Sequence, residues 1–214
     1  MKHLSSFPVI LLISTVAWMY TAQICVAQQS SAAGQNPKSV LIIYHVGSLN
    51  TKPSPPLEQT DVDALTQSTT KQVNMEKVAE AIRDRLTSLG YRVDLIKATE
   101  LTAPQKFVEY NGIIFGTPTW FSNVAYPIKK VFDEQLHRLY QQRKGRLNDK
   151  VLSGYTTAMS RGEDGPDCLQ ALTRSMKHLS NQIIDGMVIN TGDDTDTVNA
   201  AVRQFCDRFA QALK

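Results

Sequence analysis

The feature that most constrains the fold is an alternation of two hydrophobic patterns from Ser39 to the C-terminus. Short uninterrupted apolar runs, such as SVLIIY at 39–44, are typical of strands covered on both faces of a sheet. Between these runs, segments such as EKVAEAIRDRLTSLG at 76–90 carry apolar residues three and four positions apart, the spacing of an amphipathic helix. Strands that alternate with helices are joined by crossovers and therefore lie parallel in one sheet. The sequence predicts a three-layer α/β sandwich.

Five strands and four helices follow from these patterns. We expect the strands at 39–44, 91–101, 111–118, 149–160 and 185–192. We expect the helices at 76–90, 126–142 and 168–182, and from about Thr195 to the end. No internal repeat is visible, and the whole of 39–214 is predicted to form one domain.

The N-terminal 27 residues are predicted to be a secretory signal peptide rather than part of that domain. Lys2 and His3 precede an uncharged stretch at 7–27, which ends in small residues and is followed by polar sequence. An uncleaved anchor remains open, because this stretch is just long enough to span a bilayer. Residues 28–38 are predicted to be a polar linker. Because of the predicted signal peptide, we expect an exported protein, periplasmic or secreted.

Charge and cysteine usage exclude several classes of function. The formal net charge of +3 comes with no basic run interleaved with aromatic residues, so nucleic-acid binding is not expected. The histidines lack metal-ligand spacing and no Cys-x-x-Cys occurs, so no metal site is predicted. Cys168 and Cys206 each fall in a helical pattern with apolar neighbours. Buried free thiols are therefore favoured, although an oxidising compartment would permit a disulfide.

Three segments follow strands whose carboxyl ends should meet at one edge of the sheet. They are HVGSLNT after the first strand, GTPTWFSNVAYP in and after the third, and MSRGEDGPD after the fourth. In open parallel sheets, ligands bind beyond the carboxyl ends of the strands. The small residues in these segments leave backbone N–H groups accessible to a ligand. The sequence therefore predicts the binding site at this edge.

The second of these segments resembles the third-strand loop of flavodoxin-like proteins. It is especially similar to NAD(P)H:quinone oxidoreductases of the tryptophan-repressor-binding-protein A type, and to NADPH-dependent FMN reductases. The shared pattern is Gly-Thr/Ser-Pro-x-x-aromatic-x-Asn followed by a lysine-bearing helix, present here as Gly116, Thr117, Pro118, Phe121, Asn123, Lys129, Lys130, Phe132 and Asp133. The resemblance extends over about 39–214 and implies a five-stranded sheet of order 2-1-3-4-5 with FMN as cofactor.

In this interpretation the third-strand segment holds the flavin ring. Hydroxyl, amide and backbone groups would meet its polar edge, and Trp120 or Phe121 would supply a flat face. The segment after the fourth strand would close over the ring. The resulting ring-contact residues are Thr117, Pro118, Thr119, Trp120, Phe121, Asn123, Ser160, Arg161 and Gly162.

The resemblance also places the FMN phosphate on the turn after the first strand. Flavodoxins carry a Tyr-His-Ser-x-Thr-Gly-Asn-Thr-like turn there, and Ser48, Asn50 and Thr51 are its phosphate-binding candidates here. Val46 and Leu49 depart from that pattern. A Pro-, Ser- and Thr-rich insertion at 52–75 separates the turn from its helix. Three alternatives stay open: these residues still hold the phosphate, the hydroxyls of 68–70 replace them, or FMN binding is lost.

The resemblance implies an oxidoreductase that uses NAD(P)H to reduce quinones or similar acceptors. No acid–base or nucleophile–base pair stands out in the sequence, which is compatible with a cofactor that performs the chemistry. Two other functions remain: an electron carrier served by a redox protein partner, and a flavin-free binding module. A homo-oligomer is compatible with each of the three.

Overall fold

The computed structural model describes residues 37–47, 74–142, 147–159 and 162–214. Contacts divide the chain into two compact units, Met1–Pro37 and Lys38–Lys214. The predicted signal peptide and most of the predicted linker lie outside the described residues. Everything below concerns the second unit.

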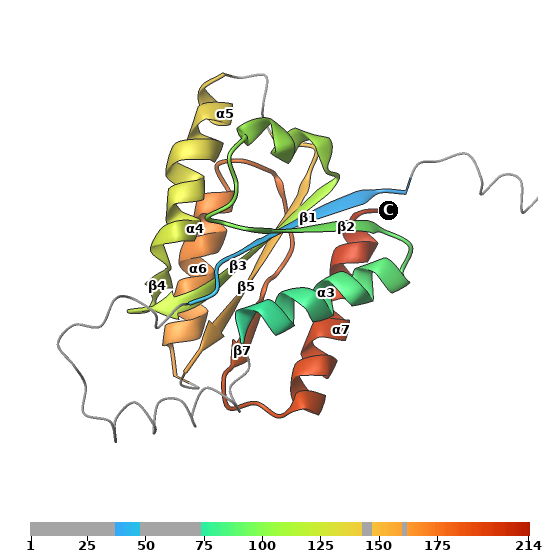
Figure 1. The fold of residues 1–214 in the computed structure, drawn as a ribbon, viewed down its shortest axis with the longest axis vertical. Coiled ribbons are helices and arrows are strands. Elements are labelled where there is room, and N and C mark those ends of the chain that lie inside the picture. The colour runs from blue at the N-terminus through green and yellow to red at the C-terminus, as the bar shows by residue number, and fades with distance from the viewer. Residues whose placement is uncertain (1–36, 48–73, 143–146, 160–161) are drawn as a thin grey trace, which may run out of the picture. The chain divides into compact units, whose positions relative to one another are not determined.

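A parallel sheet forms the centre of the domain, in the order β2-β1-β3-β5-β6 (Figure 1). Two further short strands lie off this path, because β4 pairs antiparallel with β3 and β7 pairs parallel with β5. The strands are β1 (Ser39–Tyr44), β2 (Arg92–Lys97), β3 (Gly112–Trp120), β4 (Asn123–Val124), β5 (Val151–Ala158), β6 (Gln182–Ile183) and β7 (Met187–Asn190). The α/β class and the predicted order are confirmed, although the sheet has more strands than the expected five.

The predicted fifth strand, 185–192, is present only as β7, and β6 precedes it on the other side of Asp185 and Gly186. A Cβ at Gly186 would lie 2.4 Å from the carbonyl oxygen of Gly154, so β5 and the intervening segment approach too closely for a side chain. The backbone N–H of Ile184 still donates to Leu152, and its carbonyl accepts from the Ser153 hydroxyl at 2.9 Å. The chain thus stays attached to β5 while its regular pairing is interrupted.

Helices cover both faces of the sheet (Figure 1). On one face lie α3 (Met75–Ser88) and α7 (Thr195–Ala212). The other face carries α6 (Asp164–Met176) and a continuous helical stretch made of α4 (Tyr126–Lys130), the π-helical turn η2 (Val131–Leu136) and α5 (His137–Gln141). A 3₁₀ turn, η1 (Pro104–Glu109), precedes β3. The four predicted helices are present, but α6 begins four residues earlier than expected and ends at Met176, so that Gln182 belongs to β6.

The core has two halves, one on each face of the sheet. Side chains of β1 alternate between them: Val40 and Ile42 face α3 and α7, whereas Leu41 and Ile43 face the other layer. All of β1 is buried, as the uninterrupted apolar run predicts.

Cys168 and Cys206 are buried free thiols, as expected. They lie on α6 and α7, on opposite faces of the sheet, so they cannot form a disulfide with each other. Among the helices of the described ranges, none is long and apolar enough to cross a membrane.

Candidate functional site

The carboxyl ends of β1, β3 and β5 bring the predicted segments together at one edge of the sheet. The backbone N–H of His45, just after β1, donates to the carbonyl of Gly116 in β3 at 3.1 Å. A Cβ at Gly47 would lie 3.3 Å from the ring of Pro118, so this turn packs directly on β3. The predicted meeting of the first and third segments is therefore present.

The third-strand segment is a β-hairpin rather than the expected loop. β3 continues to Trp120, which pairs with Asn123 of β4 across a two-residue turn. The turn residues Phe121 and Ser122 have φ angles of 49° and 57°. Positive φ at both positions identifies a type I′ turn, whose twist matches that of the paired strands. Each non-glycine residue in this conformation costs about 1–2 kcal/mol.

Thr117 has a structural role in this hairpin. Its side chain is fully buried, its hydroxyl accepts a hydrogen bond from the Ala125 N–H at 2.9 Å, and it donates to the Pro118 carbonyl at 3.0 Å. Ala125 is the N-cap residue of α4, so Thr117 ties the hairpin to the start of that helix. The expected contact between the Thr117 hydroxyl and a cofactor stays a prediction; in this structure the group is buried and its hydrogen bonds are made within the hairpin. Pro118 is also buried.

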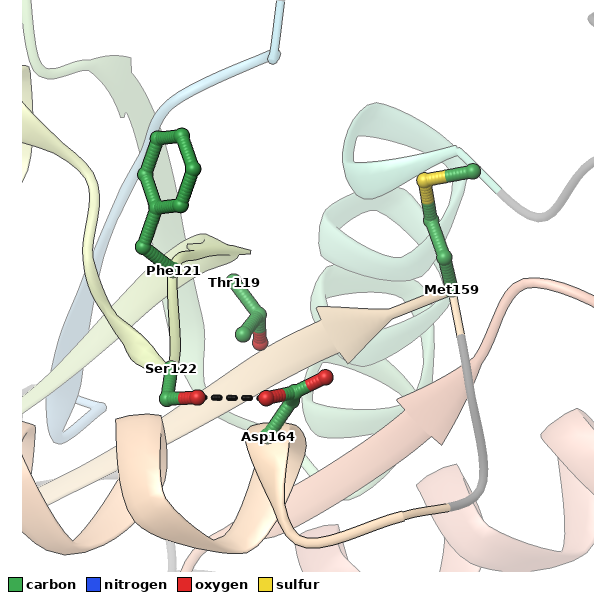
Figure 2. Close-up of a pocket in the computed structure, with 5 residues that line it drawn as sticks. All are labelled: Thr119, Phe121, Ser122, Met159 and Asp164. Atoms are coloured by element: carbon green, nitrogen blue, oxygen red, sulfur yellow. Dashed lines mark hydrogen bonds between the residues drawn. The ribbon is translucent and has the colours of Figure 1, made fainter.

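A cavity of about 530 Å³ lies between the hairpin and the start of α6 (Figure 2). Phe121 and Met159 stand on its two sides, and Thr119 lies between them. Their exposed fractions are 104% for Phe121 and 84% for Met159, high for large apolar side chains. Across the lower end of the view, the Ser122 hydroxyl donates to the Asp164 carboxylate and links the hairpin tip to α6. The cavity thus combines exposed apolar walls with hydroxyl and carboxylate groups.

Trp120 lies beside this cavity and outside its lining. Its ring meets the His45 ring edge-on, with 5.8 Å between centroids, and 40% of the residue is exposed. Burial lowers the pKa of His45, which favours a neutral ring in this contact. Asn123 is exposed, and its side-chain oxygen accepts from the Val124 N–H. Of the two predicted aromatic faces, Phe121 is the one that borders the cavity.

A chain of polar groups runs inward from the cavity. The hydroxyls of Thr119 and Thr156 are 2.8 Å apart, and Thr156 donates to the sulfur of Cys168 at 3.6 Å. Thr156 and Cys168 are fully buried, whereas Thr119 is half-buried and reaches the cavity. Burial raises the pKa of the Cys168 thiol, and hydrogen bonds from the two threonines oppose this. The thiol is therefore inert as a nucleophile at neutral pH.

A second cluster of polar side chains lies at the carboxyl ends of β1 and β2. One carboxylate oxygen of Glu76, in the first turn of α3, is 3.0 Å from both the Tyr44 hydroxyl and the Lys97 ammonium. Hydrogen bonds from Lys97 and then from Tyr44 lower the pKa of Glu76. Burial is the main cause that raises the pKa of Tyr44 to about 12, and the hydrogen bond to Glu76 is the second cause.

The N-terminus of α3 has its own cap. The Asn74 side-chain oxygen accepts from the backbone N–H groups of Glu76 at 2.6 Å and of Lys77 at 3.3 Å. These are the helix N–H groups that would otherwise be available to an anion. With the Glu76 carboxylate beside them, this helix end offers little to a phosphate.

Several predicted residues lie outside the described part of the chain: Ser48, Asn50, Thr51, Ser160 and Arg161. Their roles therefore stay predictions. Gly162 is described and lies in the bend before α6.

Sequence reasoning missed the Ser122–Asp164 link and the polar chain behind Thr119. Ser122 and Asp164 belong to no recognisable motif. Thr119 reaches Thr156 only because β3 pairs with β5, in which Thr117 lies opposite Thr156.

Comparisons with known proteins agree with this architecture. The family described as Flavodoxin matches residues 68–160. An NAD(P)H dehydrogenase (quinone) from Chromohalobacter salexigens is 30% identical over 108 residues, which are 50% of this chain and 52% of that protein. A flavodoxin from Clostridium saccharobutylicum is 32% identical over 119 residues, which are 55% of this chain and 65% of that protein. The chain thus spans less than two thirds of either relative.

Solved structures show the same fold at low identity. Oxidised flavodoxin 1 from Bacillus cereus has a TM-score of 0.58 at 13% identity, covering 81% of this chain and 98% of that one. A WrbA-like flavodoxin from Agrobacterium tumefaciens has a TM-score of 0.54 at 17% identity, covering 82% and 97%. With the sheet order, these findings lead to one conclusion: the chain has the flavodoxin-like fold, and over residues 68–160 it is similar to the family described as Flavodoxin.

Proposed function

We propose that the protein is an FMN-binding oxidoreductase that uses NAD(P)H to reduce quinones or similar acceptors. The observation that carries the proposal is the cavity bordered by Phe121, Met159 and Thr119 at the carboxyl edge of the sheet. The two relatives, a flavodoxin and an NAD(P)H dehydrogenase (quinone), suggest the cofactor class and the reaction.

The cavity fits the ring end of a flavin. Its volume of about 530 Å³ lies within the range of pockets for small ligands. The exposed Phe121 ring would lie against the flat heterocycle, and Met159, directly after β5, would cover it from the opposite side of the cavity. Thr119 and Ser122 place hydroxyls where the polar edge of such a ring needs partners.

The phosphate end fits less directly. Because Asn74 occupies the first N–H groups of α3 and Glu76 adds a negative charge, the helix N-terminus is a poor phosphate site. We therefore propose the hydroxyls and backbone of Ser48–Thr51 for the phosphate, the first of the three alternatives that the sequence leaves open. Whether this phosphate site functions determines whether the protein prefers FMN over an unphosphorylated flavin.

The flavin supplies hydride acceptance and electron transfer when it is bound. The protein's part is to hold the ring, to fix its polar edge and to keep one face covered. The absence of a metal site stays an expectation from the sequence. The described residues contain no group of three side chains that could hold a metal ion.

A second candidate is an electron carrier served by a redox protein partner. The full exposure of Phe121 and the high exposure of Met159 favour it, because a protein partner needs an accessible ring edge. We also propose export, which rests on the sequence of residues 1–27 alone. An exported protein would meet little NAD(P)H, so export favours the carrier.

The visible absorbance spectrum of the purified protein, before and after addition of FMN, tests the proposal. We expect a yellow protein, or one that becomes yellow with FMN and keeps the colour through gel filtration. Oxidation of NADPH in the presence of a quinone supports the enzyme, whereas a bound flavin that NADPH does not reduce supports the carrier. A colourless protein that does not bind FMN contradicts both. Riboflavin titrated in parallel isolates the contribution of the phosphate.

A further inference from the structure

The polar chain behind the cavity fixes the direction in which Thr119 can form hydrogen bonds. Each threonine hydroxyl has one proton to donate. Thr156 gives its proton to the sulfur of Cys168, so its oxygen is left to accept the proton of Thr119, 2.8 Å away. The Thr119 proton therefore points inward, away from the cavity.

The hydrogen bond between Thr156 and the sulfur lies inside the core. Thr156 and Cys168 are fully buried, so water does not compete for this bond. Thr119 lines the cavity, and the lone pairs of its oxygen are consequently what its hydroxyl has left for a ligand.

We infer that Thr119 acts as a hydrogen-bond acceptor toward an N–H group of the bound ring, and that Thr156 is the positioning residue that holds it in that role. This inference rests on the proposed function. Two-electron reduction of a flavin, with uptake of protons, converts ring nitrogen N5 from an acceptor into an N–H donor. An acceptor fixed in the cavity wall therefore favours the reduced ring over the oxidised one.

The test uses Thr156→Val, which keeps the side-chain volume and removes the hydroxyl. Thr119 then loses its inward acceptor and can turn its proton toward the ring, which favours the oxidised form. We expect the reduced flavin to bind three- to tenfold more weakly relative to the oxidised flavin, in line with one hydrogen bond. This change lowers the two-electron midpoint potential by about 15–30 mV, since a tenfold change corresponds to about 30 mV.

Two further variants separate positioning from packing. Thr156→Ser retains the hydroxyl and should restore the wild-type potential. Thr157→Val replaces a neighbouring buried threonine on the opposite face of the sheet, and should leave the potential unchanged. Each protein is loaded with FMN and reduced by dithionite in equilibrium with a reference dye, and circular dichroism confirms that it is folded.

A lower potential in Thr156→Val, restored in Thr156→Ser, supports the inference. An unchanged or higher potential in a Thr156→Val protein that still binds FMN overturns it and leaves the proposed function standing. Failure of the wild-type protein to bind FMN overturns the proposed function and this inference together.

Discussion

Replacing Thr117 by valine tests whether this residue holds the hairpin or meets a ligand. Its hydroxyl is fully buried and satisfies the N–H of Ala125, which is itself fully buried. Valine has nearly the same shape as threonine and leaves that N–H without a partner. Because the resemblance to flavodoxins suggests a ligand contact at this position, the two roles predict different outcomes.

The size of the effect follows from the contacts of Thr117. A buried N–H without a partner costs about 1–3 kcal/mol, and loss of the bond to the Pro118 carbonyl adds about 0.5–1.5 kcal/mol. Burial of a methyl group instead of the hydroxyl returns up to about 0.8 kcal/mol. We expect a net loss of about 2 kcal/mol in the free energy of unfolding. For a domain of this size, that loss lowers the Tm by about 4–8 °C.

Urea unfolding followed by circular dichroism measures this loss, and a thermal scan checks the Tm. Thr117→Ser is the matched control, because it retains the hydroxyl and removes only a methyl group, at a cost of about 1 kcal/mol. The reasoning is refuted if Thr117→Val is as stable as the wild type while its affinity for FMN falls. That result would mean that the hydroxyl faces the ligand.

Three other substitutions and conditions probe the site. Phe121→Ala should leave the free energy of unfolding within about 0.5 kcal/mol of wild type, because the ring is exposed. It should weaken FMN binding about two- to tenfold in a fluorescence titration, the worth of one stacked ring; unchanged binding would remove Phe121 from the site. Glu76→Gln should strengthen FMN binding at low salt and leave riboflavin binding unchanged, because only the phosphate responds to the lost charge; equal effects on both ligands would contradict this. Finally, the pKa of Glu76 is lowered in the folded protein by Lys97 and Tyr44, so this carboxylate stabilises the fold above its ordinary pKa of 4.5 and ceases to do so as the pH falls through the lowered value. The difference in unfolding free energy between wild type and Glu76→Gln should therefore be present at pH 7 and disappear in acid; a difference independent of pH would show that the bonds to Lys97 and Tyr44 contribute nothing.

The layers of the fold could be predicted because each depends on a local pattern. The apolar run of β1 and the stripe of α3 record which faces are buried, and the strand order follows from the family resemblance. The Asp185-Gly186 pair is itself a turn signal at the start of the predicted fifth strand. Its consequence, the separation of β6 from β7, follows from the contact with Gly154, which only the folded sheet creates.

The site could be located from the sequence but not described in detail. Two-residue hairpins are normally marked by Asn-Gly or Asp-Gly, and Phe121-Ser122 carries neither signal, so a loop was expected. α6 begins at Asp164 because proline is tolerated in the first turn of a helix, which lets Pro166 lie inside it. The partners of Thr117 and Thr119 depend on long-range packing, which residue types alone do not encode.

The hairpin at the cavity separates two kinds of constraint on this stretch of chain. The side chain of Phe121 projects from the turn and bears on no core packing, so its identity is free to change with the ligand, whereas Ser122 is tied to Asp164. The number of residues between Trp120 and Asn123 is not free, because adding or deleting one would exchange the two faces of every paired position. Among proteins that share this hairpin, we therefore expect sequence variation at the position of Phe121 together with a fixed length.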